Sequence, residues 1–116
     1  MKIEKIVESG KVILSDDGIE KARISAELSE DVLKIALQGI FNSVIESYLQ
    51  NELDFYAASG ILKFSVDCGK IEAVFPGSFL SLLDFRSKVE CRGGTVEFLN
   101  KPDNLKKFEK SIGSNL

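Results

Sequence analysis

A helix-like segment between two strand-like segments restricts the fold of this chain more than any other feature. Residues 31–39 (DVLKIALQG) largely alternate apolar and polar side chains, and residues 61–67 (ILKFSVD) also have the composition of a strand. Between them, apolar side chains recur at helical spacing from Ile45 to Ala57, and Gly60 is a typical helix stop. Because a strand–helix–strand connection places its strands parallel, this part of the sequence predicts an α/β fold.

Strand-like segments also precede this βαβ unit. Residues 11–14 (KVIL) and 19–28 (IEKARISAEL) are rich in apolar residues, and the SDDG sequence between them is typical of a hairpin turn. The turn lacks the alternating oxygen ligands and the distal glutamate of a calcium loop. We therefore expect residues 1–20 to contribute an additional strand or a hairpin to the sheet.

Two more helices and one more strand are predicted after the βαβ unit. The first helix is expected to begin at Ser78, to bury Phe79 and to end at the double glycine 93–94. TVEFL at 95–99 predicts the next parallel strand, and NKPD at 100–103 predicts the start of a closing helix. The expected fold class is α/β, with a mixed sheet of about four to six strands, an N-terminal β-rich segment and three or more helices packed mainly on one face.

The chain has 116 residues, which is the size of one domain, so we expect residues 1–116 to form a single domain. It contains no histidine, and this removes the usual general base near neutral pH and the commonest ligand of transition metals. Cys68 and Cys91 are far apart in the sequence, so we expect partly buried, reduced thiols rather than a disulfide or a zinc site. These features predict a protein that is not an enzyme and that holds no metal and no cofactor.

Charge and hydropathy argue against further kinds of partner. The formal net charge of -3 repels phosphate backbones, so nucleic acid is not an expected partner. No segment approaches the roughly 20 apolar residues that cross a bilayer, and the N-terminal MKIEKIVESGK sequence has charges where a signal peptide would be apolar. We therefore expect a cytoplasmic protein that does not insert into a membrane.

Two local motifs lie at the expected helix starts. The sequence from Ser43 to Glu46 fits a capping box, which predicts that the first helix begins near Ser43. The sequence from Phe75 to Phe79 (FPGSF) predicts a tight turn before the second helix. The turn has a structural interpretation, with a Pro-Gly turn, a serine cap and two core phenylalanines. It also has a functional one, since α/β folds place their sites in loops at the carboxyl ends of parallel strands.

Four segments of the chain carry a family pattern in the right order and at fitting separations. They are a strand (DVLKIALQGIFN, 31–42), a strand with a turn and a helix (ILKFSVDCGKIEAVFPGSFLSLL, 61–83), a double glycine with a strand and N-x-P (GGTVEFLNKP, 93–102) and a closing helix (LKKFEKSIG, 105–113). Together they resemble the STAS domains of sulfate transporters and anti-sigma-factor antagonists. Asp67 matches an aspartate at the end of a strand in that family. The resemblance covers most of the chain and implies a STAS-like fold.

The chain departs from the family pattern at positions that matter for regulation. The family's D-S-S-G turn is replaced by FPGS at 75–78, which places Gly77 where the regulatory phosphoacceptor serine would stand. The resemblance therefore implies that the usual serine phosphorylation switch is absent. Asn42 stands where the family commonly has an aspartate. Phe75 replaces a polar family residue near the surface, so we expect Phe75 to be partly exposed while Phe79 faces the sheet.

The resemblance implies a non-catalytic module that binds a regulatory protein, such as an anti-sigma factor or a kinase-like regulator. The expected partner-binding residues are Asn42, Ser43, Phe75, Pro76, Gly77, Ser78 and Phe79. One alternative is a cytoplasmic subunit of a membrane transport complex, since STAS-like domains also serve transporters. Another is a small-ligand or nucleotide-binding domain whose ligand lies at the N-terminus of the second helix.

Overall fold

The computed structural model describes residues 2–116 and contains a six-stranded sheet whose strands follow one another in sequence order. The strands β1 to β4 pair antiparallel, whereas β4, β5 and β6 pair parallel. This arrangement confirms the predicted α/β class and mixed sheet. The elements are β1 (Glu4–Glu8), β2 (Lys11–Asp16), β3 (Ile19–Ser29), β4 (Val32–Phe41), α1 (Glu46–Ala57), β5 (Lys63–Val74), α2 (Pro76–Cys91), β6 (Thr95–Leu99) and α3 (Asp103–Ile112).

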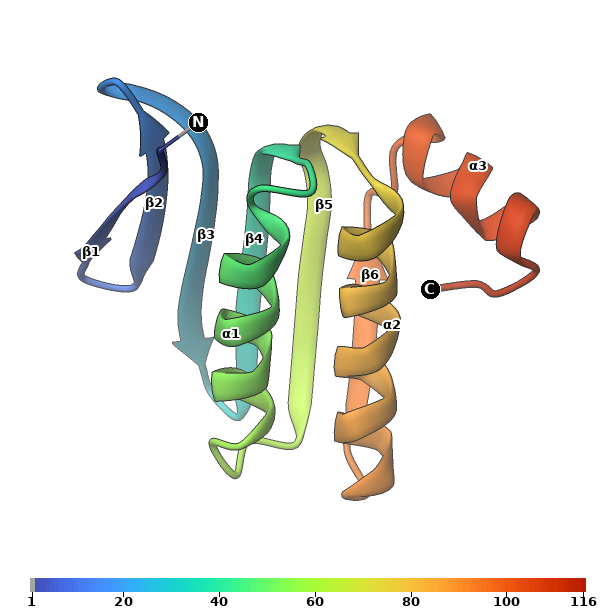
Figure 1. Ribbon diagram of the computed structural model, residues 1–116. Coiled ribbons are helices and arrows are strands. Elements are labelled where there is room, and N and C mark those ends of the chain that lie inside the picture. The colour runs from blue at the N-terminus through green and yellow to red at the C-terminus, as the bar shows by residue number, and fades with distance from the viewer. Residues whose placement is uncertain (1) are drawn as a thin grey trace.

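The helices α1 and α2 lie side by side on one face of the sheet, and α3 lies beyond β6 at one end of the molecule (Figure 1). The molecule measures 41 × 35 × 21 Å, and its short dimension corresponds to one sheet and one layer of helices. The core lies between these two layers. Its largest fully buried side chains are Phe41, Phe79, Phe85, Leu14, Ile24, Ile35, Leu37, Ile45, Leu49, Leu53, Leu82 and Leu105.

The strands alternate buried and exposed side chains because one face of the sheet is packed and the other is open. In β4, Leu33, Ile35 and Leu37 are buried, while Lys34 and Ala36 are exposed on the opposite face. The first two strands form a hairpin within the segment that we expected to add a strand or hairpin. Its outer strand, β1, is exposed along its whole length.

Strand β5 runs to Val74, well beyond residue 67, where the strand predicted from the sequence ended. A bulge hides this continuation in the sequence, because the extra residue interrupts the two-residue period of apolar side chains. The bulge is visible in the register, where β5 has one more residue than β4 between two successive pairs, Ala36 with Asp67 and Gln38 with Lys70. The parallel pairing with β4 therefore continues as far as the turn that leads into α2.

A glycine is required where β3 pairs with the second half of β4. Gly39 has a φ angle of 103°, in the left-handed region that favours glycine. A Cβ atom at this position would overlap backbone atoms of Lys21 and Ala22 on β3. The missing side chain lets the two strands approach closely just before β4 ends at Phe41.

Candidate functional site

The sequence-predicted site residues come together at the edge of the sheet where β4 and β5 end. The backbone N–H of Phe75 donates a 2.9 Å hydrogen bond to the carbonyl oxygen of Phe41 and so joins the two strand ends. Asn42 and Ser43 follow Phe41, and Pro76 follows Phe75. In Figure 1 the two segments lie at the same end of the sheet, at the starts of α1 and α2. The structure therefore brings both halves of the candidate site to one edge.

Asn42 rather than Ser43 organises the start of α1. Its side-chain Oδ1 accepts hydrogen bonds from the backbone N–H groups of Val44 (3.0 Å) and Ile45 (3.1 Å). The helix begins at Glu46, and Ser43 is exposed, so the predicted capping box between Ser43 and Glu46 is wrong. Asparagine is also a strongly preferred residue before a helix, and its side chain readily closes a turn on the following backbone N–H groups. That preference is the sequence signal that could have identified the cap.

Glu46 belongs to α1, but its side chain reaches the start of α2. A Cβ atom at Gly77 would overlap the Glu46 carboxylate, so the absence of a side chain at position 77 leaves room for this group. The position is electrostatically favourable, because the free N–H groups at a helix N-terminus attract negative charge. The helix itself begins at Pro76, after Phe75, without a side-chain cap. No pattern in the sequence indicated that a residue of α1 would occupy this space.

Ser78 and Phe79 are both fully buried. The hydroxyl oxygen of Ser78 has no hydrogen-bond partner among the described residues, and the helix starts before it. The predictions that Ser78 begins and caps this helix are therefore wrong. Phe79 stacks on Phe108 of α3, with ring centroids 5.6 Å apart and an angle of 30° between the rings. This contact agrees with the predicted burial of Phe79 and ties α3 to the start of α2.

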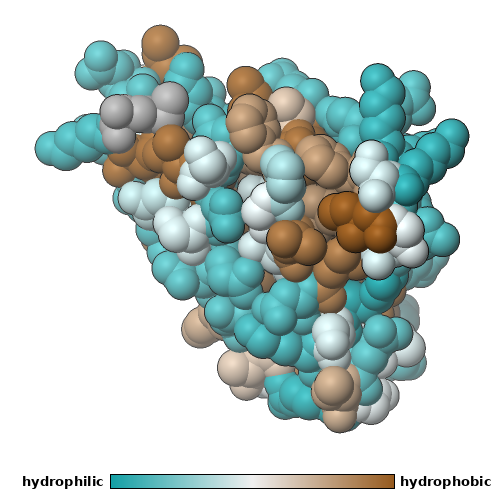
Figure 2. Space-filling model, turned by 45° about the vertical axis from the view of Figure 1, so that its right-hand side comes forward, coloured by the Kyte–Doolittle hydropathy of each residue, from teal (hydrophilic) through white to brown (hydrophobic). Residues whose placement is uncertain are grey.

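Apolar side chains are exposed around this edge. Phe75 is 47% exposed, as expected, and Leu80 and Val44 are 53% and 39% exposed. Pro76 is also exposed and lies on the same face of α2 as Leu80, since residues four apart are neighbours on a helix. We call Val44, Phe75, Pro76 and Leu80 the edge patch. Figure 2, which brings the α2–α3 side forward, shows apolar side chains gathered on the upper part of this face among hydrophilic ones.

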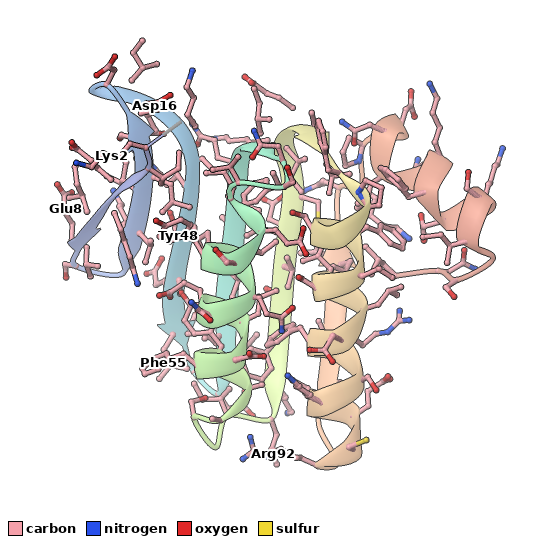
Figure 3. All side chains as sticks on the ribbon, in the orientation of Figure 1. Lys2, Glu8, Asp16, Tyr48, Phe55 and Arg92 are labelled. Carbon is pink, nitrogen blue, oxygen red and sulfur yellow. The ribbon has the colours of Figure 1, made fainter. Side chains whose placement is uncertain are left out.

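A second exposed aromatic lies outside the edge patch. Phe55 is 71% exposed on α1. In Figure 3 the side chains of Tyr48 and Phe55 project from α1 on the side of β3 and the N-terminal hairpin. Beside them, a hollow of about 390 Å³ is lined in part by Val7 and by the ion pair between Lys5 and Glu52. The sequence pattern did not single out this position.

A polar network covers the contact between α1 and α2 farther from the edge. Lys88 Nζ lies 2.8 Å from Asp54 Oδ1 and 2.9 Å from Asp84 Oδ2. The side-chain amide of Gln50 donates to the same two carboxylates, at 2.9 Å and 3.0 Å. The hydrogen bond from Lys88 holds the pKa of Asp84 below its ordinary value. The outer surface of the helices is therefore apolar at the edge and polar below it.

Asp67 lies in the middle of β5 rather than at the end of a strand, which corrects its expected position. Its Oδ1 accepts hydrogen bonds from the backbone N–H of Gly69 (2.9 Å) and from the side-chain amide of Asn100 (3.2 Å). These bonds hold the bulge of β5 against the residue that follows β6. The second half of β5 separates Asp67 from the turn at Phe75, so this aspartate does not belong to the candidate site.

Other side chains with chemical potential are scattered or buried. Among residues 2–116, no three metal-ligating side chains lie together as a site would require. Cys68 is fully buried and Cys91 is exposed, so the expectation of two partly buried thiols is wrong. Burial raises the pKa of the Cys68 thiol to about 12, which keeps it protonated near neutral pH. Within the described residues, no helix has the length and apolar character to cross a membrane.

The fold is similar to that of solved anti-sigma factor antagonists. One from Mycobacterium paratuberculosis has a TM-score of 0.73 at 12% identity, covering 80% of this chain and 79% of that chain. A putative one from Thermotoga maritima has a TM-score of 0.70 at 11% identity, covering 78% of each chain. The phosphorylated Bacillus cell fate determinant SpoIIAA has a TM-score of 0.66 at 13% identity, covering 78% of this chain and 83% of that chain. No family model and no curated protein matches the sequence. The chain has the STAS-like fold that its sequence resemblance implied.

Proposed function

We propose that this chain is a non-catalytic interaction module that binds a regulatory protein through the edge patch and the adjoining residues Asn42, Ser43 and Gly77, while the buried Ser78 and Phe79 support this surface from within. The observation that carries the proposal is the exposed ring of Phe75, whose backbone is fixed by its hydrogen bond to Phe41. A rigidly held aromatic loses little entropy on binding and supplies a large contact area, which is typical of interface anchors. Leu80 and Pro76 extend the same apolar surface. The shared fold of the anti-sigma factor antagonists supports a partner of the anti-sigma-factor or kinase-like class.

Binding through this edge does not depend on serine phosphorylation of the turn. Gly77 has no hydroxyl group, and the space that a side chain would occupy is filled by the Glu46 carboxylate. Ser78 is fully buried, so its hydroxyl group is shielded from a kinase. The carboxylate also weakens the alternative of an anionic ligand at the start of α2, because the two negative charges would repel each other. We infer a module that acts in the cytoplasm and presents a constant surface to its partner.

Affinity purification tests the proposal when the tagged full chain is recovered from its native cell and the bound proteins are quantified by mass spectrometry. We expect Phe75→Asp and Leu80→Asp to lose the proteins that the wild type enriches. Phe55→Asp is the matched control, since it places the same charge on an exposed aromatic outside the patch. Circular dichroism and the melting temperature should stay close to wild type in all three variants. Equal capture by Phe75→Asp and the wild type would show that the edge patch is not the interface.

A further inference from the structure

The face of the sheet opposite α1 and α2 has a hollow of its own. Side chains of paired residues project from the same face of a sheet, so the register defines rows across this open face. One row contains Lys11, Ser25, Ala36 and Asp67, taken from β2, β3, β4 and β5. Small side chains occupy the middle of the row, and Ser65 on β5 adds another small side chain in the next row. The centre of the open face is therefore lower than its surroundings.

The hollow has the size of a small-molecule site. Its main part measures about 600 Å³ and is lined by residues of β2 to β6 and of the turn before β2, including Ser25, Ala36 and Ser65. A smaller hollow of about 240 Å³ shares Lys11, Ser25, Ala36 and Asp67 with it and adds Arg23, Gln38 and Lys70 to the lining. The bulge of β5 lies beside this smaller hollow, and bulges increase the local twist of a sheet. Ligand pockets typically have volumes of about 300–1,000 Å³, so the joined hollows are large enough for a small organic molecule.

The smaller hollow concentrates positive charge in a protein that is acidic overall. Lys11, Arg23 and Lys70 all line it. Neither lysine forms an ion pair within residues 2–116. The one acidic residue in the lining is Asp67, and its Oδ1 already accepts two hydrogen bonds at the bulge. In the larger hollow, Glu27 and Lys34 are paired across β3 and β4, so their charges offset each other.

Arg23 gives a second and independent indication of an anion. Its Nη2 atom donates a 2.6 Å hydrogen bond to Glu20, which fixes the guanidinium group. Its Nε atom is shielded from solvent and has no acceptor among the described residues. A buried donor without an acceptor is unfavourable, whereas an oxyanion in the adjoining hollow would satisfy it. The amide side chain of Gln38 pairs across the strands with Arg23 and adds a further donor beside it.

We propose that the open face binds a small organic phosphate. The phosphate group lies in the smaller hollow against Arg23, Lys11 and Lys70, because a doubly charged oxyanion matches several cations and the fork of an arginine. The rest of the molecule lies over Ser25, Ala36 and Ser65, where small side chains leave room and hydroxyl groups can hydrogen-bond. The hollow is concave and of limited size, which favours a small molecule over a second protein surface. This site is separate from the edge patch and does not depend on the proposed function.

Titration of the isotope-labelled full chain with glycerol 3-phosphate, followed by amide NMR at constant ionic strength, tests the proposal. We expect saturable shifts at Ser25, Gln38 and Lys70, with a dissociation constant of about 1 mM or lower. Arg23→Gln and Lys70→Gln should each weaken binding by about tenfold, which corresponds to the loss of a charge-assisted hydrogen bond. Lys106→Gln is the matched control, because it removes the same charge from an exposed position on α3. Unchanged melting temperatures would show that the variants remain folded.

Three results would overturn the proposal. The first is the absence of saturable shifts up to about 10 mM glycerol 3-phosphate, which is about ten times the highest dissociation constant that we expect. The second is an equal loss of binding in Lys106→Gln, since this would show that only the overall charge matters. The third is a preference for succinate over the phosphate, which would contradict the proposed ligand class.

Discussion

In its first turns, helix α2 is apolar on two sides, but the fold uses only one of them. The inner side, with Phe79, Leu82, Phe85 and Val89, is completely buried against the sheet and α3. The outer side begins with Pro76 and Leu80 and continues the exposed surface of Phe75. A helix that is apolar all round is usually buried all round, and a contiguous exposed apolar patch commonly marks an interaction site. The apolar residues of the inner side therefore stabilise the fold. The apolar residues of the outer side remain exposed among the described residues, so the fold does not explain why they are apolar.

The most severe test of this comparison replaces Phe79 and Phe75 with aspartate, in two separate variants. Phe79→Asp should unfold the protein, because truncating a buried phenylalanine already costs about 3–5 kcal/mol and a buried charge adds to that loss. The total stability of a domain of this size is only about 5–15 kcal/mol. Phe75→Asp should change the free energy of unfolding by no more than about 0.5 kcal/mol, as is usual for a surface substitution.

Urea denaturation followed by circular dichroism measures both variants. Phe79→Leu serves as a control for Phe79→Asp, since it keeps an apolar side chain and should leave a folded, destabilised protein. If Phe75→Asp destabilised the fold as much as Phe79→Leu, the outer side would also be a structural surface. The distinction between the two sides of α2 would then disappear.

The comparison extends to the loop that carries Val44 of the edge patch. Asn42→Ala should destabilise the protein by about 1 kcal/mol, because two backbone N–H groups lose their acceptor before α1. Ser43→Ala is the matched control, with an expected change below about 0.5 kcal/mol at this exposed position. Denaturation midpoints of the two variants measure the difference. A larger effect of Ser43→Ala would restore the capping box that the sequence suggested.

Much of the inner architecture could be predicted from the sequence because burial imposes a period on each element. The βαβ unit from residue 31 to 67 and the burial of Phe79 follow from that period. Two features broke it: the bulge after Asp67 shifted the pattern in β5, and proline hid the first turn of α2. The bulge adds one residue to the strand, and the proline removes one backbone N–H donor from the helix. Neither change can be identified from the local spacing of apolar residues.

The candidate site was harder to predict, since it depends on which side chain reaches which neighbour. Ser43 and Asn42 are both good caps, and only the path of the loop selects the asparagine. The contact between Glu46 and Gly77 joins two helices that are far apart in the sequence. The open-face hollow likewise arises from the alignment of four strands, so no single segment reveals it. The sequence therefore predicted where the candidate site lies in the fold, but it did not predict the side-chain contacts within that site.

The start of α2 allows a finer test, since Gly77 and Glu46 should be energetically coupled. Glu46→Ala should cost about 0.5 kcal/mol, because it removes a negative charge from a helix N-terminus. Gly77→Ala should have almost no net effect in the wild type, since the gain in helix propensity is offset by displacement of the carboxylate. In the Glu46→Ala background, the same change should stabilise the protein by up to about 1 kcal/mol.

A double-mutant cycle in urea measures this coupling, which we expect to be about 0.5–1 kcal/mol. The cycle with Gly77 and Glu90 is the control, because Glu90 lies near the opposite end of α2 and should show no coupling. Additive effects of Gly77→Ala and Glu46→Ala would mean that the carboxylate does not occupy the space above Gly77. The support for a turn without a phosphorylation switch would then rest on the missing hydroxyl group of Gly77 and on the burial of Ser78.

The smallest expected effect concerns the polar continuation of the outer side of α2. Asp84 and Lys88 follow Leu80 at four-residue intervals, and unlike Leu80 they have partners on α1. The hydrogen bond from Lys88 lowers the pKa of Asp84, so its contribution to stability is present above the ordinary aspartate pKa of about 4 and is lost as the pH falls through the lower, folded-state value. Asp84→Asn should therefore reduce the free energy of unfolding by about 0.5 kcal/mol at pH 7, a typical value for an exposed ion pair. The difference from wild type should shrink as the pH is lowered below about 4, and it should also shrink in high salt.

Denaturation at pH 7 and at pH 3 measures this change, with Glu90→Gln as a control for removing an exposed carboxylate from the same helix. A difference that persists unchanged at pH 3 would show that packing, rather than the ion pair, accounts for the role of Asp84 and that the outer side of α2 contributes to the fold below the edge patch.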